Sequence, residues 1–248
     1  MEILLRKYKK ILLAGFVFFL VVGIAGTAMA LSTWDEFFDG GFDAGELFGT
    51  AQIPSPPLGG GSTLDEITGS IFVPPIGSFS TDVDMYRIYI PIPSAFSASA
   101  VFSTSIDPQL FLFDDLTGLG VYANNNALLP LSSFLPSGHP LGPSVAGFYN
   151  LAISTDSRDP ISLGGGIFPS LSLPGAVVGP TGPGGSETIS DWSGPGSSVD
   201  GDYAIHLTGA AFVSSAPLPV PEPSTFLMVG TLLLWLVVTR SPKGCQII

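Results

Sequence analysis

The sequence contains one cysteine, Cys245, and few charged residues. A single cysteine excludes an internal disulfide framework and a zinc finger built on cysteine ligands. Charged residues make up 11% of the chain, against roughly 25% in soluble domains, which excludes a highly charged disordered chain and a coiled coil. Glycine and proline are instead abundant, at 31 and 23 of the 248 residues, and they predict many turns and few long helices.

Positive charge is scarcest in the middle of the chain. Between residues 31 and 221 only Arg87 and Arg158 are basic, whereas 18 residues are acidic, so this stretch carries a charge of −16. Such a surface repels nucleic acids and anionic lipids, and we therefore predict no nucleic-acid partner. The charge is compatible with divalent cations; the alternative is that it serves solubility alone.

The N-terminus has the composition of an export signal. Four of the first ten residues are basic, an apolar run follows, and the segment ends in Ala28-Met29-Ala30. This order is typical of a secretory signal peptide. We predict a signal peptide over residues 1–30, export by the Sec machinery and cleavage after Ala30 by signal peptidase, with Ala28 and Ala30 as processing residues. The alternative is an uncleaved membrane anchor.

The C-terminal segment 221–248 also has three ordered parts. Pro221-Glu222-Pro223 precedes an apolar run over residues 226–238, and two basic residues follow. A helix over this run would be about 20 Å long, short of the roughly 30 Å hydrocarbon core, so flanking residues or a thinner bilayer must help it to span. The prolines keep the approach extended for a processing enzyme. The alternative is a plain tail anchor on a proline-rich stalk.

Val-Pro-Glu-Pro-Ser at 220–224, the short apolar span and the basic tail resemble the PEP-CTERM sorting signal. Arg240 and Lys243 are separated here, whereas a tight arginine cluster would fit the pattern better. The resemblance implies an exosortase substrate that is membrane-anchored by a transmembrane helix before processing. It also implies a location at the cell surface or in an extracellular matrix of exopolysaccharide or biofilm. The residues that the exosortase would recognise are Pro221, Glu222 and Pro223.

Alternation of apolar and polar residues dominates the middle of the chain and is typical of strands. The clearest alternating runs cover residues 84–90, 96–102, 148–154 and 203–208, and residues 109–113 are predicted to form a short apolar strand. Short strands separated by turns predict an all-β body over residues 63–213, a β-sandwich or jelly roll that is large enough to bury a core. We expect an N-terminal signal helix and a C-terminal transmembrane helix to flank this body.

Three stretches are rich in glycine, proline and other turn formers. Residues 31–62 are interpreted as an N-terminal extension and linker, and residues 214–220 as a second linker. Residues 160–201 form a long insertion in the body, and loops of this length are usually functional or disordered. Its apolar piece at 167–169 and Trp192 indicate that the insertion packs back onto the sheet in places.

The body resembles the bacterial pre-peptidase C-terminal (PPC) domain. The resemblance is carried, in this order along the chain, by residues 82–88, 106–114, 147–153 and 201–205. It implies a non-catalytic β-sandwich accessory domain of secreted proteins. Some relatives of this kind bind calcium or extracellular polymers.

Oxygen-bearing side chains around residues 109–113 are the main candidate metal ligands, because Ca²⁺ takes six to eight oxygen ligands. The candidates are Asp107, Asp114, Asp115, Asn124 and Asn126. Asp107 and Asp115 lie some 20 Å or more apart if the strand is extended. The more compact grouping is therefore Asp114 or Asp115 with the asparagine loop, residues 124–126. The alternative is an Asx-rich hairpin turn. Asp82 and Asp84, on one face at i, i+2 spacing, are candidates for a second ion site or solvated residues at the start of a strand.

No catalytic constellation is found in the sequence. His139 and His206 lack a neighbouring nucleophile, and no G-x-S-x-G, H-E-x-x-H or P-loop motif is present. Trp34 and Trp192 lie outside the predicted strands and are candidates for ligand contact. We therefore expect that the protein is not an enzyme and requires no cofactor, with Ca²⁺ as the one candidate ligand ion. We expect an exported protein with a structural or adhesive role, and extracellular polysaccharide is a candidate partner. The alternative is a calcium-dependent carbohydrate-binding module.

Overall fold

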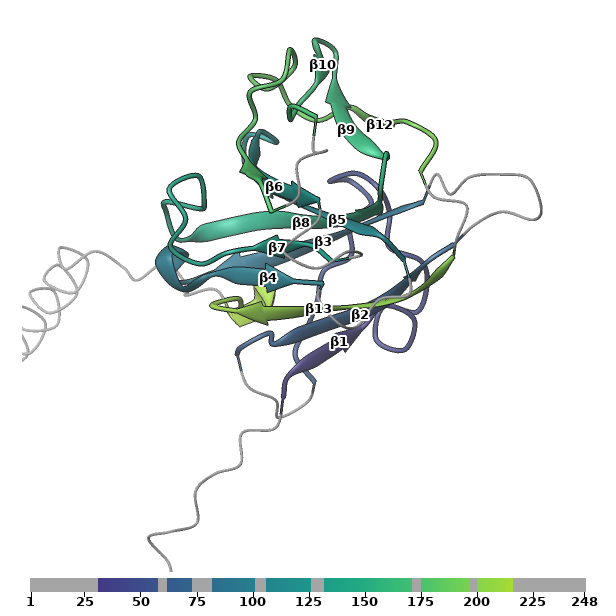
Figure 1. Ribbon diagram of the computed structural model, residues 1–248. Coiled ribbons are helices and arrows are strands. Elements are labelled where there is room, and N and C mark those ends of the chain that lie inside the picture. The colour runs from purple at the N-terminus through teal and green to yellow at the C-terminus, as the bar shows by residue number, and fades with distance from the viewer. Residues whose placement is uncertain are drawn as a thin grey trace, which may run out of the picture.

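The computed structural model describes residues 31–57, 62–72, 82–100, 106–125, 132–170, 175–196 and 200–215. Within these ranges the chain forms thirteen strands and two short 3₁₀ turns (Figure 1). The strands are β1 (Thr33–Asp35), β2 (Glu66–Ile71), β3 (Val83–Ile90), β4 (Ser97–Ser99), β5 (Pro108–Asp114), β6 (Gly120–Asn125), β7 (Phe134–Leu135), β8 (Gly147–Thr155), β9 (Asp159–Ser162), β10 (Gly165–Gly166), β11 (Val177–Val178), β12 (Asp191–Ser193) and β13 (Gly201–Thr208). The 3₁₀ turns are η1 (Pro93–Ala95) and η2 (Val213–Ser215). The prediction of an all-β body is confirmed.

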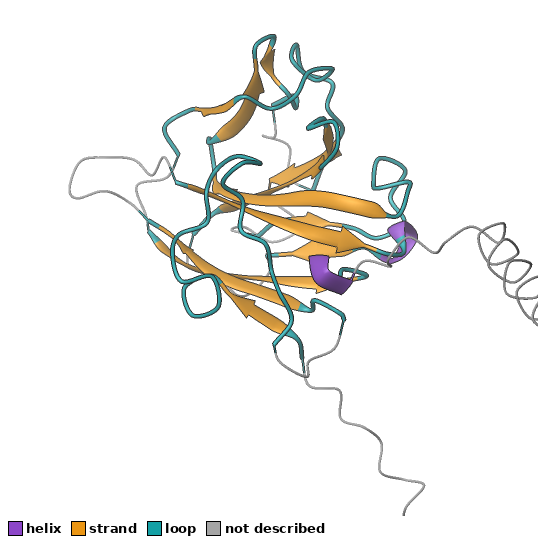
Figure 2. Cartoon of the chain, turned by 180° about the vertical axis from the view of Figure 1, so that it is seen from behind, coloured by secondary structure: helices purple, strands orange, loops and turns teal. Residues whose placement is uncertain are grey.

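The strands form two five-stranded sheets and one small sheet. The first sheet has the order β1-β2-β13-β4-β7, and the second has the order β11-β6-β5-β8-β3. All neighbours are antiparallel except β1 and β2, which are parallel. The small sheet, β10-β9-β12, lies beyond the second sheet, on the side away from the first (Figures 1 and 2).

The core between the two large sheets follows from the two-residue period of the strands. In β13, Tyr203, Ile205 and Leu207 are buried, while Asp202 and His206 are exposed on the opposite face. The same alternation in the other strands directs one apolar row of each sheet inward. The largest fully buried side chains of this core are Tyr86, Tyr122, Tyr203, Phe96 and Phe212.

The second sheet is buried on both faces. In β5, Leu110 and Leu112 face the first sheet, while Phe111 and Phe113 point outward into a second apolar cluster. That cluster is completed by side chains from outside the two sheets, which are Leu47, Phe48, Ala51, Ile167, Phe168, Ile189 and Trp192. Four consecutive apolar residues, at 110–113, are the expected consequence of burial on both faces.

The outer cluster gives structure to two segments that are poor in strand signals. The insertion packs back through Ile167, Phe168 and Trp192, as its apolar pieces indicate. Residues 31–57 belong to the body rather than to a free extension, since β1 extends the first sheet and Phe48 packs on the second. The sequence did not indicate this because the segment supplies only one three-residue strand.

The two predicted export segments lie outside the described residues. They are residues 1–30, with the cleavage residues Ala28 and Ala30, and residues 221–248, with Pro221, Glu222 and Pro223. Of the helices that the structure does describe, none has the length and apolar character needed to cross a membrane.

Candidate metal centre

Two carboxylates of the N-terminal segment meet a third from β3. Glu36 directly follows β1, Asp43 lies in the next loop, and Asp84 is the second residue of β3. Each offers one oxygen, and these oxygens all lie within 4.8 Å of one another. The cluster therefore joins the first sheet, the second sheet and the N-terminal segment.

Asp84 occupies a core position. Its neighbours Val83 and Met85 face the outer cluster, whereas Tyr86 and Ile88 face the first sheet. Alternation places Asp84 on the same inner face as Tyr86, and its side chain is fully buried. A carboxylate at this position needs polar partners, because burying an unpaired charge is costly.

The partners of Asp84 satisfy only one of its oxygens. The Tyr203 hydroxyl donates to Oδ2 over 2.7 Å, and it lies 2.5 Å from the Tyr86 hydroxyl. Oδ1 is buried, and no N–H or hydroxyl group in the described ranges donates to it. The carboxyl groups of Asp84 and Glu36 also lie close enough to share a proton, and this hydrogen bond opposes the rise in the pKa of Glu36. A buried polar atom without a partner is rare in native proteins and requires an explanation.

Glu36 is held in place by backbone groups. The backbone N–H of Ala44 donates to Oε1 over 2.7 Å, and that of Ser70 donates to Oε2 over 2.9 Å. Gly69 makes the close approach possible, because a Cβ there would collide with the Tyr203 hydroxyl and with Glu36 Oε2. The protein therefore fixes the position of the Glu36 carboxylate without a bound ion.

No basic side chain in the described ranges neutralises this cluster. Arg87 forms a bidentate pair with Asp115, at 2.9 and 2.7 Å. Arg158 lies 3.6 Å from Glu46 and donates to two backbone carbonyls. Since these two are the only arginines or lysines between residues 31 and 221, the three carboxylates have no lysine or arginine counter-ion in the part of the chain that the structure describes.

The carboxyl groups of the cluster and of Asp82 have raised pKa values, and burial is the main cause. Burial first, and then the charges of Glu36 and Asp82, raise the pKa of Asp84 well above its ordinary value. Burial is also the main cause that raises the pKa of Asp82 to about 6 and the pKa values of Glu36 and Asp43. A bound cation would reverse this balance by stabilising the ionised forms.

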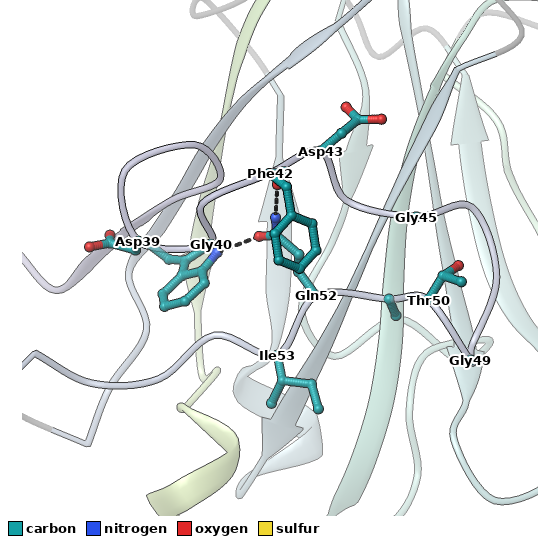
Figure 3. A pocket seen from close by; sticks show the side chains of 11 residues that line it. Asp39, Gly40, Phe42, Asp43, Gly45, Gly49, Thr50, Gln52 and Ile53 are labelled. Atoms are coloured by element: carbon teal, nitrogen blue, oxygen red, sulfur yellow. Dashed lines mark hydrogen bonds between the residues drawn. The ribbon is translucent and has the colours of Figure 1, made fainter.

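A cavity of about 530 Å³ lies next to the cluster. Trp34, Phe42, Gln52 and Ile53 line it, and Gln52 links its walls by accepting from Trp34 Nε1 over 3.0 Å and donating to the Phe42 carbonyl (Figure 3). Asp43 also lines the cavity, but Figure 3 shows its carboxylate directed away from Gln52.

The predicted grouping of Asp114 or Asp115 with the asparagine loop is not formed. Asn124 pairs with Leu110, near the opposite end of β5, because β5 and β6 form an antiparallel hairpin whose turn follows Asp114. Asp114 instead caps that turn by accepting from the backbone N–H of Thr117 over 2.8 Å. The alternative of an asparagine-rich hairpin turn is not formed by Asn124 and Asn125, because both belong to β6.

Asp115 and Asn124 have structural partners of their own. Besides Arg87, Asp115 accepts from Asn150 Nδ2 over 2.8 Å, and its bonds to Arg87 hold its pKa below the ordinary value. Asn124 donates to the Ala176 carbonyl and accepts from the backbone N–H of Phe134. Asn126 lies outside the described residues.

Of the other candidate residues, some belong to the carboxylate cluster and others have structural roles. Asp84 is a buried member of the cluster, and Asp82 accepts from the backbone N–H of Phe72 beside it. Trp192 is 4% exposed and packs in the outer cluster. Trp34 is 7% exposed, and it lines the cavity beside Asp43, so its candidacy for ligand contact stays a prediction. His206 pairs with Glu66 at 2.9 Å.

Sequence reasoning missed Glu36 and Asp43 because both lie in the segment interpreted as an extension. The available signal was the concentration of aromatic and acidic residues at 34–43. Their approach to Asp84 depends on the parallel pairing of β1 with β2, which no local pattern indicates.

Comparison with known proteins supplies no relative. No protein-family model, curated protein or solved structure matches the chain.

Proposed function

We propose that this is an exported protein of the cell surface or extracellular matrix whose β body binds Ca²⁺ between Glu36, Asp43 and Asp84. The observation that carries the proposal is the buried Oδ1 of Asp84, to which no N–H or hydroxyl of the described residues donates. It belongs to a group of three carboxylates that no basic side chain within the described ranges approaches. A divalent cation provides the missing compensation.

The ligand chemistry favours a hard cation. All three side chains offer oxygen, and no cysteine or histidine belongs to the group. Carboxylates with waters or backbone carbonyls suit Ca²⁺, whereas zinc prefers nitrogen and sulfur ligands. Such an ion would connect the N-terminal segment to both sheets, in a body that has no cysteine for a disulfide.

Export and matrix association rest on the two ends of the chain. The resemblance to a PEP-CTERM tail, together with the signal-peptide pattern, supports processing by signal peptidase and exosortase. A PPC-like sandwich with no apparent nucleophile favours a structural or adhesive role and no catalysis. The intact mass of the protein isolated from its host tests both processing steps, and a mass equal to that of the whole chain would contradict them.

Calorimetric titration of the full-length protein in detergent with CaCl₂ tests the cation site. We expect binding with a dissociation constant near 10⁻⁴–10⁻³ M, as in extracellular modules, and at least about tenfold weaker binding in Asp84→Asn. Asp202→Asn is the matched control, because Asp202 lies on the exposed face of β13. Equal affinity in Asp84→Asn and in the wild type would overturn the site.

A second candidate function is calcium-dependent carbohydrate binding. The supporting observation is that Phe42 and Ile53, which line the cavity beside Asp43, are 67% and 50% exposed. Aromatic and aliphatic surface beside a polar cavity suits the apolar face of a sugar ring. Titration with exopolysaccharide fragments, with and without CaCl₂, separates this function from a purely structural ion, since no heat in either condition removes it.

A further inference from the structure

A second group of unsatisfied oxygens lies at the start of β5. Asp107 Oδ1, Gln109 Oε1 and Asn125 Oδ1 are all buried and have no hydrogen-bond partner. Gln109 and Asn125 are only 1% and 4% exposed. Three orphaned oxygens on neighbouring residues are not explained by the packing of the core.

The backbone brings these three side chains to one place. Gln109 and Asn125 are directly paired across β5 and β6, so their side chains lie on the same face at neighbouring positions. Asp107 precedes Gln109 by two residues, and alternation directs it to that face as well. Phe111 and Phe113 show that this is the outer face of the second sheet, whereas Asp84 lies on the inner face.

Hydrogen bonds fix which end of each amide is available. Gln109 Nε2 donates to the Thr155 carbonyl over 2.9 Å, and Asn125 Nδ2 donates to Asp156 Oδ1 over 2.7 Å. Because both amide nitrogens are engaged by acceptors, the unpaired atoms are the oxygens. Asp156 is therefore adjacent to Asn125, and its backbone N–H also bonds to the Asp107 carbonyl.

Negative charge gathers here, and no lysine or arginine of the described ranges forms an ion pair with it, although Gln109 forms a hydrogen bond with Asp159. Burial and the charge of Asp156 raise the pKa values of both Asp107 and Asp159. Arg158, although next in sequence, donates to the carbonyls of Trp192 and Gly194. Orphaned oxygens among uncompensated carboxylates are the environment in which a hard cation is stable.

We propose that Asp107, Gln109 and Asn125, with Asp156 beside them, bind a second Ca²⁺ on the outer face of the second sheet. Two amide oxygens and one or two carboxylates form a typical oxygen ligand set for this ion. The site is independent of Glu36, Asp43 and Asp84, because no ligand is shared and the two groups lie on opposite faces of the sheet.

Counting bound ions in the full-length protein tests this inference separately from the first site. Equilibrium dialysis against CaCl₂ is expected to give two ions in the wild type and in Asp202→Asn. It should give one ion in Asp107→Asn, one in Asp84→Asn and none in the double variant. If the wild type binds one ion and Asp84→Asn loses it, the second site is overturned. If the wild type binds one ion and only Asp107→Asn loses it, the second site is supported and the site at Asp84 is contradicted.

A variant that adds charge gives a readout that does not depend on removing a ligand. Asn125→Asp places a carboxylate against Asp156, so the melting temperature in EGTA should fall below that of the wild type. With Ca²⁺ bound between the carboxylates, the calcium-induced rise in melting temperature should exceed that of the wild type, and calcium affinity at this site should increase several-fold. An equal or smaller calcium-induced rise would contradict the proposal.

Discussion

Two aspartates show how their surroundings decide the role of a carboxylate. Asp115 is paired with Arg87 and Asn150, and the bonds to Arg87 lower its pKa. Asp84 is fully buried with one hydroxyl donor, and burial raises its pKa. The first residue is satisfied by the protein alone, whereas the second requires a proton or a cation.

Asp115→Asn should therefore change stability and leave calcium binding intact. The pair with Arg87 is partly exposed, at 30% and 21% for the two side chains, so we expect a loss of about 1 kcal/mol in the free energy of unfolding. Urea denaturation measures this loss, and calcium titration of the same variant should reproduce the wild-type affinity. A clear loss of affinity would return Asp115 to the list of ligands.

Gly69→Ala should damage the cation site without removing a charge. The new methyl group would collide with Tyr203 and Glu36, which we expect to cost about 1–3 kcal/mol of stability and to weaken calcium binding. Gly147→Ala is the matched control, because the nearest atom to its Cβ would be 3.9 Å away. Normal calcium affinity in Gly69→Ala would show that Glu36 is not a ligand.

At the scale of residues, the sequence identifies acidic side chains that can bind a cation, but not which of them lie close together in space. Asp82 and Asp84 stand out as acidic residues in a predicted strand, and Asp107 as one beside a strand. Which carboxylates meet depends on pairing between remote strands, such as β1 with β2 and β5 with β6. For that reason Asp114 and Asp115 were plausible partners of Asn124 until the register of the hairpin was known.

At the scale of elements, the outer layer on the second sheet is the main departure from a simple two-sheet body. The apolar run at 109–113 is the sequence signal for it, since a strand without alternation is buried on both faces. The covering segments carry few strand signals because they consist mainly of turns and short bridges. The strands of the two sheets were largely predictable, and these covering loops were not.

Trp192→Ala tests how much the outer layer on the second sheet contributes to the free energy of unfolding. Trp192 is 4% exposed, packs edge-on against Phe111 and Phe113, and donates from Nε1 to the Glu46 carbonyl. Truncating a buried tryptophan costs roughly 3–5 kcal/mol, which urea denaturation would detect. Phe38→Ala is the control, because Phe38 is 86% exposed; similar losses in both variants would argue against a packed layer.

At the scale of the whole molecule, stability should depend on pH in an unusual direction. Asp82 has a folded-state pKa of about 6 against an ordinary value of 3.8, and the pKa values of Asp84, Glu36 and Asp43 are raised too. A raised acid pKa contributes stability when the group is protonated, and this contribution is lost as pH rises through the folded-state pKa.

The calcium-free protein should consequently melt at a higher temperature at pH 5 than at pH 7.5. Calcium should raise the melting temperature strongly at pH 7.5 and weakly at pH 5, because protons compete for the same carboxylates. Scanning calorimetry in EGTA and in CaCl₂ measures both trends. A calcium-free melting temperature that is lower at pH 5 than at pH 7.5 would contradict the assigned carboxyl environment.

The central claim is that a divalent cation lies between Glu36, Asp43 and Asp84. A crystal structure grown in CaCl₂, with anomalous scattering to identify the ion, tests it most directly. We predict a calcium peak with carboxylate oxygens of all three residues at 2.3–2.6 Å, including the otherwise unpartnered Oδ1 of Asp84. A water molecule hydrogen-bonded to Asp84 Oδ1, with no ion between the three carboxylates, would contradict the account.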